Sequence, residues 1–119
     1  MTNAVRGSAM AIAIGALAVL QETSALGHSN IDIVASNWKF TPATITLHVG
    51  EATTLHLTSS EGVHGLQSDE LAIPMTTISP GAAKTVEVTP KKPGKYVLHC
   101  AVFCGAGHAD MILTINVVQ

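Results

Sequence analysis

The stretch Thr44-Ile-Thr-Leu-His-Val-Gly-Glu-Ala-Thr-Thr-Leu-His-Leu-Thr58 decides the fold class, because apolar and polar residues alternate on both sides of Gly50-Glu51. Alternation with a period of two predicts strands that bury one face. The apolar positions are odd-numbered in both halves, whereas a two-residue hairpin at Gly50-Glu51 would set Ile45 opposite His56 and mix the two faces. We therefore expect the chain to bulge, or to cross to a second sheet, at this corner.

The same alternation recurs toward the C-terminus, around Val86 and Val88 and again at Leu113, Ile115 and Val117. Turn-forming residues separate these segments, notably Thr41-Pro42, Ser79-Pro-Gly81 and Lys91-Lys-Pro-Gly94. About seven short strands with one apolar face each are typical of two packed sheets. The sequence therefore predicts an all-β domain, a Greek-key sandwich or barrel.

Residues 1–27 have the pattern of a secretory signal peptide. Arg6 precedes an uncharged, mostly apolar run from Ala9 to Leu20, and small residues follow up to Gly27. An uncleaved membrane anchor and a buried helix of the domain are the alternatives, although a spanning helix needs about 20 apolar residues. The pattern predicts a periplasmic or extracellular domain over residues 28–119. In that setting two cysteines form a disulfide unless a metal holds them.

Composition excludes several classes of function. The chain has 119 residues, 12% of them charged, and a formal net charge of −2, so it has no basic surface for nucleic acid. It also lacks a carboxylate pair or a nucleophile with a general base, so we do not expect this chain to be catalytic alone. Six histidines, two cysteines and four methionines point instead to a metal.

The segment Cys100-Ala-Val-Phe-Cys-Gly-Ala-Gly-His-Ala-Asp-Met111 gathers two thiols, an imidazole and a thioether. Thiolate, thioether and imidazole together favour copper, because zinc prefers closed Cys/His tetrahedra. Gly105 and Gly107 let the loop turn tightly around an ion. Five residues between the ligands offer no competing polar side chain, so we expect an apolar and largely dry site; they are Ala101, Val102, Phe103, Ala106 and Ala109.

A mononuclear blue-copper site needs only one cysteine. Cys100 and Cys104 can instead bridge two copper ions, each of which then needs a histidine and a weak ligand. His108 is one histidine, and His64, after the Ser59-Ser60 turn, is our choice for the other. The alternatives are a disulfide, a mononuclear red or blue site with an idle cysteine, an ordinary loop histidine at 64, and a core role for Met111.

Beyond the ligand loop, the stretches Trp38-Lys-Phe-Thr-Pro42, Val63-His-Gly-Leu66, Ser79-Pro-Gly81 and Lys92-Pro-Gly-Lys-Tyr96 complete a pattern. With them the sequence resembles the binuclear copper (CuA) domain of cytochrome c oxidase subunit II, and the resemblance implies a cupredoxin-like Greek-key β-sandwich or barrel. It implies bridging thiolates from Cys100 and Cys104, imidazole ligands from His64 and His108, and a thioether from Met111. The backbone carbonyl of Val102 completes the set, although many family members carry Glu or Gln at that position.

The resemblance also implies a function. We expect an exported protein whose two copper ions carry single electrons, as the component through which electrons enter a terminal oxidase. The expected partner is a redox protein such as a c-type cytochrome or an oxidase subunit, with membrane contact only if the N-terminal segment stays uncleaved. Oxidase subunits of this kind carry membrane helices before the copper domain, so the short N-terminal run favours a soluble or loosely anchored carrier. The alternative is a periplasmic copper chaperone or storage protein that binds Cu(I) with the same ligands.

Residues outside this set are expected to be structural. His48 and His56 lie on the polar faces of their strands, and His99 should face away from Cys100. We expect Met75 to pack in the protein and Trp38 to be a core or edge aromatic.

Overall fold

Nine strands and one 3₁₀ turn form the fold of residues 27–119, the part of the chain that this computed structural model describes. The predicted signal peptide, apart from Gly27, lies outside the described residues. The strands are β1 (Ser29–Ser36), β2 (Lys39–Thr41), β3 (Thr44–His48), β4 (Thr53–Ser59), β5 (His64–Ser68), β6 (Ile73–Ile78), β7 (Lys84–Val88), β8 (Gly94–His99) and β9 (Ile112–Val118). The 3₁₀ turn spans His108–Asp110. The predicted all-β class is confirmed.

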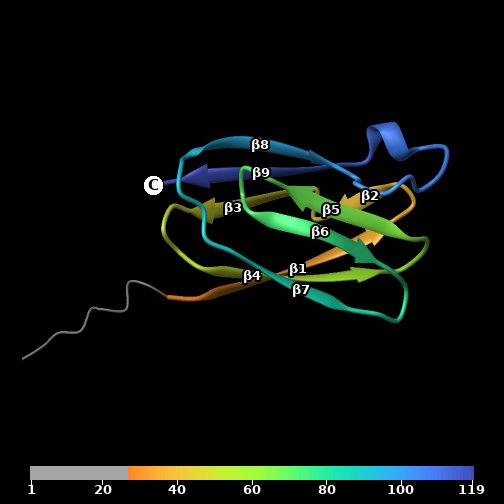
Figure 1. Ribbon diagram of the computed structural model, residues 1–119, viewed down its shortest axis with the longest axis horizontal. Coiled ribbons are helices and arrows are strands. Elements are labelled where there is room, and N and C mark those ends of the chain that lie inside the picture. The colour runs from red at the N-terminus through yellow and green to blue at the C-terminus, as the bar shows by residue number, and fades with distance from the viewer. Residues whose placement is uncertain (1–26) are drawn as a thin grey trace, which may run out of the picture.

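The strands form two facing sheets and a separate hairpin (Figure 1). One sheet has the order β2-β1-β4-β7 and the other β3-β9-β8, while β5 pairs with β6 alone. Strands β1 and β4 are parallel, as are β3 and β9. The sequence predicts about seven strands. The described residues form nine, including the short β2 and the separate hairpin of β5 and β6.

The sequence predicts either a bulge or a crossing at Gly50-Glu51, and the structure has the crossing, because β3 belongs to one sheet and β4 to the other. Gly50 lies at the corner with φ +79°, a left-handed conformation that favours glycine. Its amide donates a hydrogen bond of 2.9 Å to the Pro90 carbonyl, and the Val49 amide donates one of 2.8 Å to the Val118 carbonyl. The corner is thus tied to β9 and to the segment between β7 and β8.

The odd-numbered apolar residues of β3 and β4 face the core, as the alternation predicts. Ile45, Leu47, Leu55 and Leu57 are buried, whereas His48 is exposed. Burial of apolar surface between the sheets is the main source of stability in such a fold. The other fully buried large side chains of the core are Ile33, Phe40, Leu66, Ile73, Ile78, Met111, Leu113 and Ile115.

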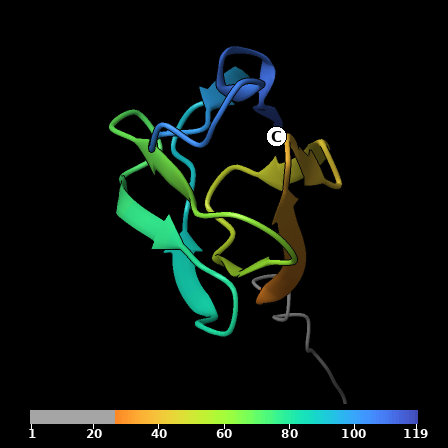
Figure 2. The same ribbon diagram turned by 90° about the vertical axis from the view of Figure 1, so that its right-hand side faces the viewer.

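One end of the sandwich carries the loop between β8 and β9, residues 100–111, which we call the ligand loop. It lies at the right in Figure 1, and Figure 2 looks onto this end. The loop that precedes β5 and the turn between β1 and β2 reach the same end. Among the described residues, no helix is long and apolar enough to cross a membrane.

Candidate metal centre

Backbone hydrogen bonds fix both ends of the ligand loop. The β8–β9 ladder ends at the pair His99 and Ile112, and the Cys100 amide extends it with a bond of 3.0 Å to the Met111 carbonyl. The next amide, that of Ala101, donates a hydrogen bond of 3.0 Å to the Gly65 carbonyl on β5. Because Gly65 follows His64, this bond places the loop beside the histidine that comes from another part of the chain.

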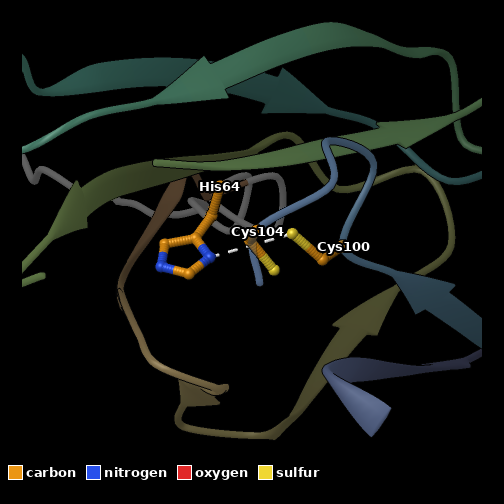
Figure 3. Close-up of side chains that lie close together, drawn as sticks. All are labelled: His64, Cys100 and Cys104. Carbon is orange, nitrogen blue, oxygen red and sulfur yellow. Dashed lines mark hydrogen bonds between the residues drawn. The ribbon is translucent and has the colours of Figure 1, made fainter. Parts of the chain in front are cut away.

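His64, Cys100 and Cys104 form one donor cluster, whose nitrogen and sulfur atoms all lie within 4.8 Å of one another (Figure 3). His64 Nδ1 lies 3.8 Å from Cys100 Sγ. The Val102 carbonyl oxygen lies 3.2 Å from the same sulfur. A thiol, an imidazole and a backbone carbonyl therefore converge on the Cys100 side.

The Cys104 side has a matching arrangement. His108 Nδ1 lies 3.5 Å from Cys104 Sγ, and Met111 Sδ lies 3.8 Å from it. His108 comes from the 3₁₀ turn, and Met111 from the position just before β9. Both cysteines are free thiols. Each sulfur therefore has an imidazole nitrogen of its own and one further weak donor nearby.

A hydrogen bond fixes the orientation of the His64 ring. Its Nε2 lies 2.8 Å from the Glu61 carbonyl oxygen, which also accepts a bond from Ser59 Oγ. A carbonyl only accepts hydrogen bonds, so Nε2 carries the proton and Nδ1 presents its lone pair to the thiols. Metal-binding histidines use the same division of roles between their two nitrogens.

The donor set fits a soft metal ion. Two donors at about 2.0–2.3 Å from one tetrahedral ion lie about 3.3–3.8 Å apart, and the spacings above are of this size. Burial, together with the neighbouring Cys100 sulfur, raises the pKa of the Cys104 thiol from 9.0 to about 11. In the metal-free chain this thiol is therefore protonated at neutral pH, and a metal ion must displace its proton. Thiolates with a thioether favour copper over zinc.

The structure brings all six residues proposed as ligands to one place. His64, Cys100 and Met111 are buried, whereas Val102, Cys104 and His108 are half-buried. His99 faces the surface, away from Cys100, as strand alternation predicts.

Most apolar side chains of the ligand loop do not cover the site. Phe103 is 79% exposed, and Ala101, Ala106 and Ala109 also face solvent. The loop wraps its backbone around the donors, so these side chains point outward. Three of the donor residues, His64, Cys100 and Met111, are instead buried in the end of the sandwich.

Two residues outside the predicted set lie near the site. Trp38 Nε1 donates a hydrogen bond of 2.8 Å to the Cys104 carbonyl, so this aromatic residue belongs to the ligand loop's surroundings and not to the core. Met75 is 51% exposed and does not pack in the core, although its methyl group lies close to Gly65. Gly105 and Gly107 indicate that another part of the protein packs closely against the loop. The alternation of apolar and polar residues does not identify that part as Trp38, which is 66 positions from Cys104 in the chain.

Comparison with known sequences decides the family. The family described as "Cupredoxin-like domain" matches residues 9–112. The chain belongs to this family. Two proteins from Thermus thermophilus, each called cytochrome c oxidase subunit 2, are homologues that are 32% identical to this cupredoxin over 87 residues, or 73% of its length. The aligned part spans 64% of one of these relatives and 51% of the other.

Solved structures share the fold. The periplasmic domain of subunit II of cytochrome oxidase (CoxB) from Bradyrhizobium japonicum matches with a TM-score of 0.68 and 16% identity, over 76% of this cupredoxin and 83% of that chain. A CoxB domain captured in a mixed disulfide with the thioredoxin-like protein TlpA matches with a TM-score of 0.63 and 15% identity, over 76% and 81% of the two chains.

Proposed function

We propose that this cupredoxin is an exported copper protein that holds a binuclear centre and transfers single electrons, as the component through which electrons enter a terminal oxidase. The proposed ligands are His64, Cys100, Val102 through its carbonyl, Cys104, His108 and Met111. A pair of copper ions held by these residues would supply a one-electron couple whose charge is shared between the two ions. Homology to cytochrome c oxidase subunit II supports a copper electron-transfer domain.

The observation that carries the proposal is the duplicated donor arrangement. A mononuclear site would need one thiol, yet here two thiols lie side by side, each with a separate imidazole nitrogen at 3.5–3.8 Å. The carbonyl of Val102 and the thioether of Met111 add one weak donor beside each sulfur. Six donors from one loop and one strand end are more than a single tetrahedral ion uses.

Burial of the donors favours retention of copper over its delivery. His64 and Met111 are 0% exposed and Cys100 is 3% exposed, so an accepting protein has little access to them. The His64 ring is also held by the Glu61 carbonyl. Donors that are fixed before and after an electron arrives need little rearrangement, which suits electron transfer. A copper chaperone, by contrast, needs ligands that a partner can displace.

The surface of the same end offers a place for a redox partner. Exposed apolar side chains flank the ligand-bearing segments; they are Trp38, Val63, Met75 and Phe103. The centroids of the Phe103 and His108 rings lie 5.3 Å apart, and Phe103 is exposed. The Phe103 ring therefore connects a proposed copper ligand to the protein surface. We propose that a c-type cytochrome or an oxidase subunit docks here, outside the cytoplasm, as the signal-peptide pattern of residues 1–27 suggests.

The test is electron exchange set against copper release. The copper-loaded chain in its oxidised form is mixed with reduced mitochondrial-type cytochrome c in a stopped-flow instrument, and a Cu(I) chelator is added in a parallel experiment. Electron transfer predicts oxidation of one cytochrome per chain and slow loss of copper to the chelator. A cytochrome that stays reduced, with copper passing rapidly to the chelator, would support the delivery function instead.

A further inference from the structure

The turn between β1 and β2 contacts both segments that carry the proposed ligands. We infer that Trp38 in this turn is a positioning residue for the ligand loop, and that Gly107 is a glycine because the indole ring lies against it. The inference deepens the proposed function and rests on it for the meaning of the loop, although the contacts themselves are independent of the metal.

The first contact is the hydrogen bond from Trp38 Nε1 to the Cys104 carbonyl, at 2.8 Å. The carbonyl belongs to a proposed bridging residue in the middle of a loop whose two ends are already fixed. Among the proposed ligands in the loop, Cys104 lies furthest along the chain from the two anchored ends. A hydrogen bond at this position restrains the sulfur of Cys104 relative to His108 and Met111.

The second contact comes from the neighbouring residue. The Asn37 amide donates a hydrogen bond of 3.1 Å to the Glu61 side chain. The Glu61 carbonyl accepts the bond that orients His64. Asn37 and Trp38 together therefore connect the loop that precedes β5 to the ligand loop, so one turn braces both halves of the donor cluster.

The backbone of Gly107 explains why the packing against Trp38 matters. Its φ of −94° and ψ of 11° are open to any residue, so the conformation does not require glycine. A Cβ atom at this position would lie 2.6 Å from Cγ and Cδ2 of the indole and 2.8 Å from Cβ of Trp38. Gly105 differs, because its φ of +119° favours glycine whatever its neighbours are.

A matched pair of variants tests the hydrogen bond. Trp38→Phe keeps an aromatic ring but removes the donor. Tyr96→Phe removes a bond of the same kind and length, from the tyrosine hydroxyl to the Lys92 carbonyl at 2.8 Å, in the segment that leads into β8. In the metal-free full chain, we expect Trp38→Phe to speed amide hydrogen exchange at His108 and Asp110 about fivefold to tenfold. Tyr96→Phe should leave these amides unchanged.

A double-mutant cycle tests the packing. Gly107→Ala should shift the amide resonances of the ligand loop strongly in the presence of Trp38 and only slightly in a Trp38→Gly background, where Cβ, Cγ and Cδ2 of residue 38 are all absent. The inference is wrong if Trp38→Phe exchanges like the wild type, or if Tyr96→Phe accelerates the same amides equally. Equal effects of Gly107→Ala in both backgrounds would overturn the packing argument.

A spectroscopic readout separates positioning from general stability. The copper-loaded Trp38→Phe chain should show altered copper hyperfine splitting in its EPR spectrum, while Tyr96→Phe gives the wild-type spectrum. If the wild-type chain itself shows no shared-electron pattern, the proposed function fails, but the exchange experiment on the metal-free chain still decides the role of Trp38. An unchanged Trp38→Phe spectrum on a two-copper wild type would count against positioning.

Discussion

The two imidazoles of the site have contrasting surroundings. His64 is fully buried at the start of β5, and its Nε2 is bound to the Glu61 carbonyl. His108 is half-buried in a 3₁₀ turn and lies against the exposed ring of Phe103. The Cys100 side is therefore held by the sandwich, whereas the Cys104 side meets the surface.

In the proposed function, this difference lets a small sandwich retain a metal and keep it accessible to electrons. The buried side supplies rigidity, because His64 and Cys100 come from strand ends that the core fixes. The surface side supplies a short path to a partner, at the cost of a loop that needs support from elsewhere. The predictions below change one side at a time.

Cys100→Ser should have the largest effect, because it removes the buried thiol that we propose bridges the two copper ions. We expect the copper content to fall from two ions per chain to one or none, with loss of any shared-electron signal. Serine is close in size, so the metal-free chain should still fold, as its circular dichroism spectrum would show. A Cys100→Ser chain that still binds two coppers with the wild-type spectrum would contradict bridging by this residue.

His64→Ala should cost folding stability as well as copper. The change leaves a cavity in a fully buried position, so we expect the free energy of unfolding of the metal-free chain to fall by about 2 kcal/mol. His108→Ala removes a half-buried ring and should cost no more than about 0.5 kcal/mol. Urea unfolding of both variants measures the difference. If both variants lose the same free energy of unfolding, the Cys100 side of the site is not more firmly held than the Cys104 side.

Phe103→Ser should slow electron exchange with cytochrome c without changing the centre. We expect about a tenfold fall in the second-order rate constant, equivalent to about 1.4 kcal/mol, because a large part of the exposed apolar contact is lost. Val97→Ser is the matched control, since Val97 is an exposed apolar residue on β8, outside the ligand loop. A Phe103→Ser variant as fast as the control would exclude this face as the docking site.

The smallest effect concerns pH. Burial raises the pKa of the Cys104 thiol from 9.0 to about 11, so the folded metal-free chain favours the neutral thiol. The resulting stability is complete below pH 9.0 and is lost as the pH rises toward about 11. Melting temperatures of the wild type and of Cys104→Ser, compared across this range, isolate the contribution, because the other titrating groups are shared. If the melting temperatures of the two chains change with pH in the same way, the pKa of the Cys104 thiol is not raised in the folded state.

Much of the fold could be predicted from the sequence because alternation reports directly on burial. The odd-numbered apolar residues on both sides of Gly50 predicted a bulge or a crossing between sheets, since a simple hairpin would have exposed half of them. Alternation does not say which strands become neighbours, so the parallel pairing of β1 with β4 was not predicted.

The ligand loop could be proposed from sequence because its donors are close together in the chain. His64 was found only because two thiols call for a second imidazole. The supporting roles of Trp38 and Glu61 were missed. Trp38 binds the Cys104 carbonyl and His64 binds the Glu61 carbonyl, and no side-chain pattern in the sequence reveals contacts to backbone atoms. The exposure of Phe103 was also missed, because an apolar residue in a short loop can point either way.

The measurement that tests the central claim most directly is an EPR spectrum of the copper-loaded chain, together with its copper content. The account predicts two coppers per chain and a hyperfine pattern from one unpaired electron shared equally by two copper nuclei. A pattern from a single copper nucleus, or one EPR-silent copper per chain that a chelator removes easily, would contradict the binuclear centre.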